Sequence, residues 1–334
     1  MRTATPNPRL SIVVIVYKMA RQAMNTLYSL SADYQRNVCA DDYEVIVVEN
    51  RSDNTLDPAA IARLNGHFRY FLRDETGVSP VPALNFGVTQ SSAPQLGLMI
   101  DGARMITPRV IENVLAATRM VAHPLIAVPG YNIGPAEQQY HHEHQYDEKT
   151  EERLLEKIHW QQNGYRLFDV ANLSGANPKG ALQLFLECNC LFVSRNAFDE
   201  IGGADERFNL RGGGSINLHL YRKLGMHPLH ERYLVLPGEG SFHQFHGGVT
   251  TSHSENRETI LSEFRNQLDQ IWGGEFGGAL KREPMLLGAV NSHAQRFLAE
   301  SSRKTRHRFD RMQTESLPFW PDDAFFPVTT CSSS

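Results

Sequence analysis

The chain has 334 residues, of which 41% are hydrophobic and 21% are charged, and its formal net charge is −4. This size and composition allow one large domain or two small ones, with enough apolar residues for a sizeable core. Because the net charge is weakly negative, the composition argues against nucleic acid or an anionic membrane as the main partner. A ligand that carries phosphate would therefore need local help from a metal ion, a helix N-terminus or a few arginines.

The first 130 residues alternate between patterns that are typical of buried strands and of helices. The expected strands are 10–17, 43–48, 67–72, 96–100 and 125–129. The expected helices are 20–32, 57–65, 81–90 and 108–122. This alternation predicts a mostly parallel sheet that is covered by helices on both faces.

Acidic residues stand at the ends of two of these strands. Asp101 follows the apolar run Leu96–Ile100 directly, and Glu49 ends the run that begins at Tyr43. Open α/β sheets place ligand-binding groups at the carboxyl ends of their strands. We therefore expect a ligand site at this edge, with Asp101 as its most informative residue.

The second half of the chain is less regular. Residues 131–182 are rich in charge and histidine, and they precede an expected strand at 188–193, a helix near 195–201 and a strand at 232–236. The run His141, His142, Glu143 and His144 has the composition of a metal site, but its polar setting favours a solvated face. Residues beyond 246 are expected to be helical and then polar, with a disordered end.

Two further sequence features concern the compartment. No apolar run approaches the roughly 20 residues that span a bilayer, and the first ten residues contain no apolar segment typical of a signal peptide. Four cysteines are too few for a disulfide framework. Cys188 and Cys190 would face the same side of a strand, and we expect buried, reduced thiols rather than half of a metal site. A cytoplasmic protein is therefore expected.

The order of these segments resembles the GT-A glycosyltransferases, most of all the family 2 enzymes. The resemblance is carried by three blocks, at 10–54, 83–112 and 199–250. It implies a GT-A (Rossmann-like) α/β fold with a mostly parallel sheet and helices on both faces. The implied domains are a catalytic domain at 1–250, with a nucleotide-sugar half at 1–130 and an acceptor half at 131–250, and a helical C-terminal extension at 251–334.

The resemblance also assigns residues to the pocket of a nucleotide-diphosphate sugar. Val16 and Tyr17 lie where these enzymes have the wall beside the uridine. Glu49 and Asp53, in the segment ENRSDN, stand where an acidic loop reads the base. Asn85 lies in the segment ALNFG, which matches the family pattern Ala-Arg-Asn-x-Gly except that a leucine stands in place of the arginine.

The Asp-x-Asp motif of the family is present only in part, as Asp101-Gly102-Ala103. In the family this motif holds Mg²⁺ or Mn²⁺, which bridges the diphosphate to protein carboxylates. His246 is the preferred second ligand because it precedes a Gly-rich turn with a threonine, and His243 is the other candidate. Imidazole suits Mn²⁺ better than Mg²⁺. Structural, hydrogen-bonded histidines are the alternative interpretation.

The general base of the family is also missing. After the matching segment GGADERF, the chain has Gly212, Gly213, Gly214 and Ser215 where many family 2 enzymes have Gly-Glu-Asp. An attacking hydroxyl reacts poorly unless its proton is removed. Three alternatives stay open: another acid, for which Glu187 is named first and Glu239 second; a retaining mechanism in which the leaving phosphate takes the proton; or no catalysis. The three glycines could let backbone N–H groups approach an anionic ligand, or they could equally form a flexible turn before a helix that Ser215 caps.

The resemblance implies transfer of a sugar from a nucleotide-diphosphate sugar to a hydroxyl of a glycan or glycolipid. By analogy alone, the setting would be bacterial polysaccharide biosynthesis, in the cytoplasm or at the inner face of the membrane. The alternative is a noncatalytic module that binds a nucleotide sugar or glycan. A sugar nucleotidyltransferase is disfavoured because VYKMARQAMN lacks the glycines of a triphosphate loop. The oligomeric state stays open.

Overall fold

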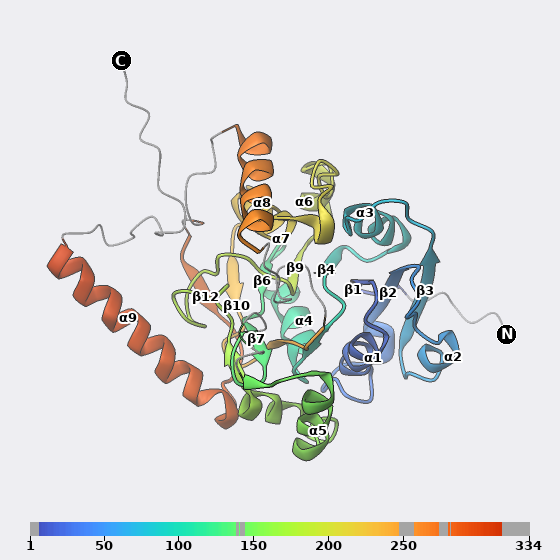
Figure 1. Cartoon of the computed structure of the whole chain (residues 1–334), viewed down its shortest axis with the longest axis horizontal. Helices are drawn as coiled ribbons and strands as arrows, with labels where there is room; N and C mark the ends of the chain where they lie inside the picture. Colours follow the sequence, from blue (N-terminus) through green and yellow to red (C-terminus); the bar gives the residue numbers. More distant parts are fainter. Residues whose placement is uncertain are drawn as a thin grey trace.

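The computed structural model describes residues 7–137, 140, 144–246, 257–273, 280 and 282–315. The described chain forms a large sheet flanked by helices and a smaller sheet beside it (Figure 1). The large sheet has the order β12-β10-β6-β9-β4-β1-β2-β3. Its strands are β1 (Leu10–Val16), β2 (Tyr43–Asn50), β3 (His67–Arg73), β4 (Gln95–Met99), β6 (Leu125–Ala127), β9 (Leu191–Ser194), β10 (Tyr233–Val235) and β12 (Pro284–Leu286).

The large sheet is mostly parallel, as the sequence predicted. Its strand β9 runs antiparallel to β4 and β6, and the other pairs are parallel. Every residue of β1 and β2 is buried, because apolar side chains on both faces of these strands meet helices. Alternate residues supply two separate cores: Val13 and Ile15 belong to one, and Ile12 and Val14 belong to the other.

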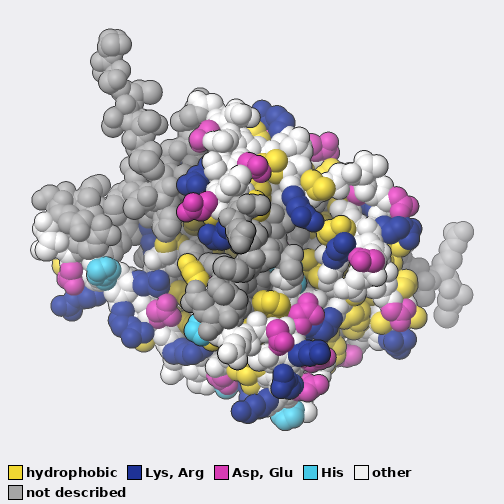
Figure 2. Space-filling model, viewed as in Figure 1, with side chains coloured by type: hydrophobic (Ala, Val, Ile, Leu, Met, Phe, Trp, Pro, Cys, Tyr) yellow, Lys and Arg dark blue, Asp and Glu magenta, His cyan; other side chains and the backbone are white. Residues whose placement is uncertain are grey.

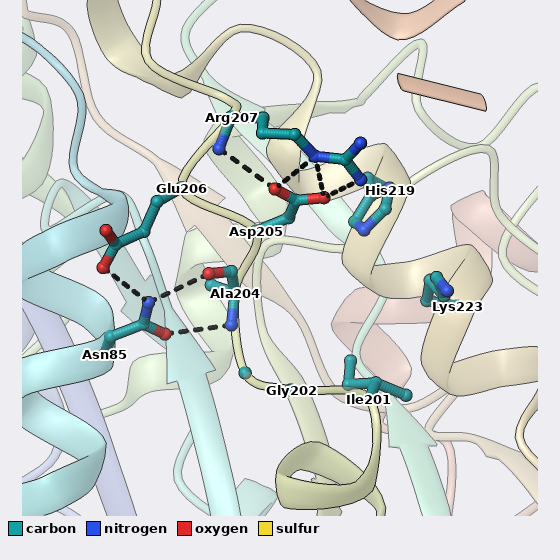
Figure 3. A pocket seen from close by; sticks show the side chains of 10 residues that line it. Asn85, Ile201, Gly202, Ala204, Asp205, Glu206, Arg207, His219 and Lys223 are labelled. Atoms are coloured by element: carbon teal, nitrogen blue, oxygen red, sulfur yellow. Dashed lines mark hydrogen bonds and ion pairs between the residues drawn. The ribbon is translucent and has the colours of Figure 1, made fainter. Parts of the chain in front are cut away.

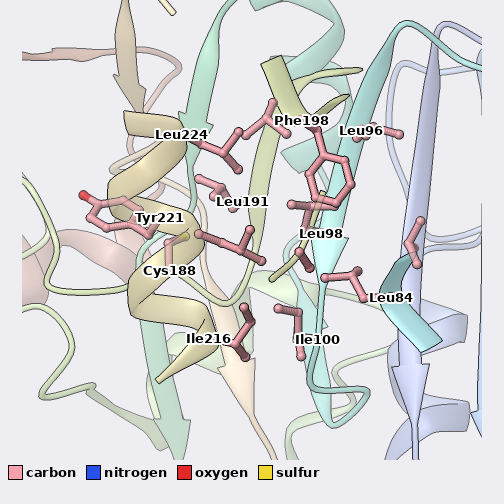
Figure 4. Packing of buried hydrophobic residues seen from close by; sticks show 14 of the residues in the cluster. Leu84, Leu96, Leu98, Ile100, Cys188, Leu191, Phe198, Ile216, Tyr221 and Leu224 are labelled. Atoms are coloured by element: carbon pink, nitrogen blue, oxygen red, sulfur yellow. The ribbon is translucent and has the colours of Figure 1, made fainter. Parts of the chain in front are cut away.

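Helices cover both faces of this sheet. Residues of α3 (Val81–Gln90), α6 (Arg195–Glu200) and α7 (Ile216–Met226) enter the core on one face. Residues of α1 (Ala20–Ser29), α2 (Pro58–Ile61) and α4 (Val110–Met120) enter the core on the other. Figure 4 shows Ile216, Tyr221 and Leu224 of α7 packed over Leu191 of β9 and Leu98 of β4.

The two neighbouring cysteines lie differently from the sequence prediction. The strand begins at Leu191, so Cys188 and Cys190 precede it instead of sharing one of its faces. Cys188 belongs to one core and Cys190 to the other. Both are free and buried, which confirms the expectation of buried thiols.

The small sheet has the order β5-β11-β7-β8 and was not predicted. Its strands are β5 (Arg104–Ile106), β7 (Gly130–Ile133), β8 (Ala171–Leu173) and β11 (Ser241–His243). A third core covers it and is largely aromatic: Tyr131 stacks on Phe242 at 5.1 Å between ring centroids, and Phe168 lies 5.0 Å from Phe242. Three- and four-residue strands carry no periodicity of their own, so only their long-range pairing shows them.

Further elements lie around the two sheets and extend the chain. They are the helices α5 (Glu148–Ile158), α8 (Arg257–Trp272) and α9 (Gln295–Glu315), with short 3₁₀ turns η1 (Ala40–Asp42), η3 (Gly164–Val170), η4 (Arg211–Gly213) and η5 (Ser292–Ala294). The predicted C-terminal helices are present. The same region also adds β12 to the large sheet, parallel to β10, and buries Phe297 in the third core.

Among the described residues, no helix combines the length and the apolar character that crossing a bilayer requires. On the face shown in Figure 2, acidic and basic side chains are interspersed, without a broad patch of one sign.

Candidate metal centre and its surroundings

The site begins at the carboxyl ends of β4, β1 and β2, which are neighbours in the sheet. Val16 at the end of β1 lies opposite Glu49 of β2. A Cβ on Gly102 would lie 2.7 Å from the backbone oxygen of Ile15, so the turn after β4 rests on the end of β1 and requires glycine. Asp101 therefore lies at the same edge as Val16 and Glu49.

Two histidines from the far end of the chain meet Asp101. The Nε2 atom of His243, the last residue of β11, lies 2.9 Å from Oδ2 of Asp101. The Nε2 atom of His246 lies 3.7 Å from Oδ1 of Asp101 and 2.9 Å from Nε2 of His243. One ligand atom from each of the three residues lies within 4.8 Å of the others, and this is the candidate metal centre.

The three ligand atoms suit a divalent ion. Neighbouring ligands of an octahedral ion, each at about 2.1 Å from the metal, are about 3 Å apart, and two of the three separations here are 2.9 Å. The set contains one carboxylate and two imidazoles. Imidazole is a ligand of Mn²⁺, Zn²⁺ and Fe²⁺ in proteins, whereas sites for Mg²⁺ are dominated by oxygen. The donor set therefore fits a transition ion better than Mg²⁺.

The protonation states also suit a metal. Burial lowers the pKa of His243 to about 4 and lowers the pKa of His246. Both rings are therefore neutral at pH 7, as ligands must be. Burial opposes ionisation of Asp101, but the hydrogen-bonding ring of His243, together with His246 and Arg104, holds the pKa of this carboxyl well below its usual range.

The segment that carries His246 is held by α1 and α5. The backbone N–H of Phe245 donates to Oε2 of Glu151 at 2.7 Å, and the carbonyl of Phe245 accepts from Gln22 at 2.6 Å. The side chain of Gln244 donates to the carbonyl of Gln22 at 2.8 Å and accepts from Asn25 at 2.8 Å. Glu151 is completely buried, and sequence analysis did not identify it because its partner is a backbone amide far along the chain.

The two candidate bases have different surroundings. Glu187 lies in the segment before β9, where burial raises the pKa of its carboxyl and Arg104 and a hydrogen bond with Asn189 lower it. Glu239 is 2% exposed. Its carboxyl accepts hydrogen bonds from Thr107 and Tyr165, so its oxygens are used inside the protein. The charge of Arg104 affects the pKa of Glu187, and the same charge affects the pKa of Asp101.

The residues assigned to the nucleoside differ in exposure. Glu49 is fully buried, and its carboxylate accepts from the backbone N–H of Leu56 at 3.0 Å and the hydroxyl of Tyr70 at 2.6 Å. Tyr17, just past β1, is 46% exposed. Asp53 is exposed and lies 3.5 Å from the ammonium of Lys18. Tyr17 is the aromatic residue of this set, and its side chain is open to a ligand.

Asn85 lies in another place, on α3. Its side chain donates to the carbonyl of Ala204 and accepts from the N–H of Ala204, both at 2.9 Å (Figure 3). It lines a pocket of about 340 Å³ together with Gly203, Asp205 and Lys223. Asp101, His243 and His246 do not line this pocket, so the structure does not bring Asn85 to the candidate metal centre.

The glycine triplet forms a tight turn. Gly212, Gly213 and Gly214 have φ of 69°, 81° and 56°, a left-handed run that side chains disfavour. Ser215 precedes α7 in the N-cap position, but its side chain makes no capping hydrogen bond. The turn therefore explains the glycines, and it brings no carboxylate. His141, His142, Glu143 and the turn at 247–250 lie outside the described residues.

Comparison with solved structures bears on the fold. TarS of S. aureus matches with a TM-score of 0.50 at 12% identity, over 91% of this chain and 45% of TarS. This chain has a GT-A-like fold. It spans less than half of the full TarS chain.

Two further matches are weaker. TarS 1–349 in complex with UDP-GlcNAc matches with a TM-score of 0.48 at 12% identity, over 92% of this chain and 76% of that one. The mannosyltransferase PcManGT of Pyrobaculum calidifontis, in complex with GDP-Man and Mn²⁺, matches with a TM-score of 0.41 at 13% identity, over 92% of this chain and 83% of that one. No family model and no curated protein sequence matches the chain.

Proposed function

We propose that this chain is a metal-assisted glycosyltransferase of the family 2 type. It would move a hexosyl or related sugar from a nucleotide-diphosphate sugar to a hydroxyl of a glycan or glycolipid. The observation that carries the proposal is the meeting of Asp101 with the rings of His243 and His246 at the ligand-binding edge of a GT-A-like sheet. Nucleotide sugars are present in the solved structures of TarS 1–349, with UDP-GlcNAc, and of PcManGT, with GDP-Man and Mn²⁺.

In this proposal, Asp101, His243 and His246 hold Mn²⁺ or, less favourably, Mg²⁺. When bound, the ion stabilises negative charge on the departing nucleoside diphosphate. Tyr17 lines the nucleoside and offers its exposed ring for contact with the base or ribose, whereas Val16 is fully buried and supports this wall from the core side. Glu49, which is buried, acts from behind the pocket wall by holding Leu56 and Tyr70.

Glu187 is the proposed general base. A base works best when its pKa lies near the operating pH, and burial moves the pKa of Glu187 in that direction. Its carboxylate would take the proton of the acceptor hydroxyl as that oxygen attacks the anomeric carbon and the bond to the diphosphate breaks. A retaining reaction, in which the leaving phosphate takes the proton, is the alternative for the same site.

The domain division at residue 250, the cytoplasmic or inner-membrane-face location and the role in polysaccharide assembly belong to the same proposal. A second candidate function is a noncatalytic module that binds a nucleotide sugar. It is favoured by the sequence at 212–215, where the family's acidic residues are replaced by three glycines and a serine.

A donor screen tests both candidates. The thermal midpoint of the full chain is measured with a panel of UDP- and GDP-sugars, with Mn²⁺ and with EDTA, and release of the nucleoside diphosphate is then followed with glycan acceptors. We expect one donor to raise the midpoint with Mn²⁺ and to be consumed, and Asp101→Asn to abolish both effects. Binding without consumption supports the module, whereas no stabilisation by any donor refutes nucleotide-sugar binding.

A further inference from the structure

Arg104 is the first residue of β5 and lies beside the candidate metal centre. It is paired with His243 in the antiparallel register of β5 and β11, so the backbone holds the two side chains in neighbouring positions. Its Nε atom lies 3.2 Å from Oδ2 of Asp101. The charge of Arg104 also affects the pKa of Glu187, His243 and His246. Arg104 is therefore the cation that the candidate metal centre and the candidate base share.

The Nε atom of the Arg104 guanidinium is buried without a hydrogen-bond acceptor. The residue is 9% exposed, and its Nε is a buried atom with no hydrogen-bond partner, because the approach to Asp101 is an ion pair without hydrogen-bond geometry. Within the described part of the chain, no other acceptor pairs with this side chain. Leaving the Nε–H donor buried and unmet costs free energy. A guanidinium has five N–H donors in all, and a ligand with several anionic oxygens could accept from more than one of them.

The charge balance points to the same class of ligand. In an Asp-x-Asp motif, two carboxylates cancel most of the charge of a bound divalent ion. Here the negative charge of Asp101 is offset by the positive charge of Arg104. The protein would therefore neutralise little of the charge of a bound ion, and that charge would remain available to attract an anionic ligand. Arginine also binds phosphate through two parallel hydrogen bonds, which a carboxylate-rich site does not offer.

We propose that Arg104 binds the diphosphate of the ligand directly, through its free guanidinium N–H groups and beside the metal. The site would then hold a diphosphate weakly without metal and tightly with it. That the anion belongs to a nucleotide sugar rests on the proposed function, whereas the anion site itself rests on Arg104 and its surroundings.

The test uses inorganic pyrophosphate and the full chain. Isothermal titration in EDTA compares wild type with Arg104→Gln, Arg104→Lys and Arg63→Gln, the last being a matched charge change at an exposed residue. We expect wild type and Arg63→Gln to bind pyrophosphate alike, and Arg104→Gln to bind it at least about 10-fold more weakly. The affinity of Arg104→Lys should fall between them, because lysine keeps the positive charge but lacks the planar guanidinium that makes two parallel hydrogen bonds. Equal binding by wild type and Arg104→Gln, or no binding by wild type, overturns the proposal.

A second titration with Mn²⁺ alone separates this role from structural support of Asp101. Removing a cation beside Asp101 should raise the affinity of Arg104→Gln for Mn²⁺ several-fold, whereas loss of a structural support would lower it and overturn the proposal. If Arg104→Gln does not fold, Arg104→Lys decides by its weaker pyrophosphate binding at unchanged thermal midpoint. If pyrophosphate binding depends on Arg104 but no nucleotide sugar is turned over, the result would refute glycosyl transfer. The same result would still support the proposed anion site at Arg104.

Discussion

The candidate metal centre joins two regions that differ in how they are built. Asp101 follows a buried strand in the middle of an eight-stranded sheet, where β1 and β2 have no exposed residue. His243 and Arg104 lie on three-residue strands of the small sheet, which rests on an aromatic core. The large sheet thus supplies an acid whose position follows from local burial, and the small sheet supplies groups whose positions depend on distant pairing. Variants in the two regions should therefore fail in different ways.

The largest effect is expected on the large-sheet side, at Asp101. Asp101→Asn keeps the shape of the side chain but removes the only carboxylate of the candidate metal centre. We expect turnover with Mn²⁺ to fall on the order of 1,000-fold, as for loss of a main electrostatic group, while circular dichroism stays unchanged. Turnover that remains dependent on Mn²⁺ in this variant would remove Asp101 from the metal site.

On the side of the small sheet, Glu239 should make the stability of the protein depend on pH. Burial raises the pKa of Glu239 to about 7 from a usual 4.5. Between these two values the folded state binds more protons than the unfolded state, so the free energy of unfolding falls as pH rises through this window. The shift corresponds to about 3 kcal/mol, which is fully lost above pH 7.

Glu239→Gln removes this titration. Denaturation by guanidinium at pH 4.5 and pH 8 should show wild type losing about 3 kcal/mol more stability than the variant. Equal losses in the two proteins would mean that Glu239 is already ionised at low pH in the folded state.

Glu187→Gln tests the proposed base, which lies between the two regions. We expect turnover to fall about 100-fold or more, with the Kd for the donor unchanged and with loss of the acidic limb of the pH–rate profile. Glu239→Gln is the matched control, because its carboxyl is used by Thr107 and Tyr165, and it should keep most of its turnover. A small loss in Glu187→Gln would direct attention to the retaining alternative.

The two histidines allow a direct comparison of motif with geometry. The sequence motif ranks His246 first, whereas the distances to Asp101 are 2.9 Å for His243 and 3.7 Å for His246. We expect each alanine variant to weaken Mn²⁺ binding by about 10- to 100-fold, with the larger loss for His243, because β11 holds it in place. Electron paramagnetic resonance of free Mn²⁺ measures both losses, and a larger loss for His246→Ala would restore the ranking from the motif.

The smallest effect is expected from the residue that holds the His246 segment. Glu151→Ala removes the acceptor of the Phe245 N–H, so the position of His246 should loosen and Mn²⁺ should bind about 10-fold more weakly. Glu151→Gln keeps an acceptor oxygen and should restore most of the affinity. Glu152→Ala, at an exposed position of the same helix, is the control. Equal Mn²⁺ affinity in wild type and Glu151→Ala would show that the ring of His246 is positioned by other contacts.

The sequence was sufficient for the large sheet because each of its main strands is a continuous buried run. Strands such as β1, β2 and β4 need apolar residues on both faces, and the acids at the ends of β2 and β4, Glu49 and Asp101, are visible in the chain. The resemblance to GT-A enzymes added the late histidines as candidates for the same ion. It also placed Asn85 in the donor pocket, a role that remains a prediction, although the side chain bonds to Ala204 in the structure.

By itself, therefore, the sequence determined the parallel sheet, the position of Asp101 at its edge and the burial of Cys188 and Cys190, because these follow from runs of neighbouring residues. Only the tertiary structure determined that the small sheet forms, that Arg104 lies beside Asp101, and that Glu151 accepts a hydrogen bond from the segment that carries His246. Strands of three residues and a single buried glutamate carry no local signal. Their positions exist only once residues from distant parts of the chain have paired, since the pairing itself supplies the hydrogen bonds and the burial that stabilise them.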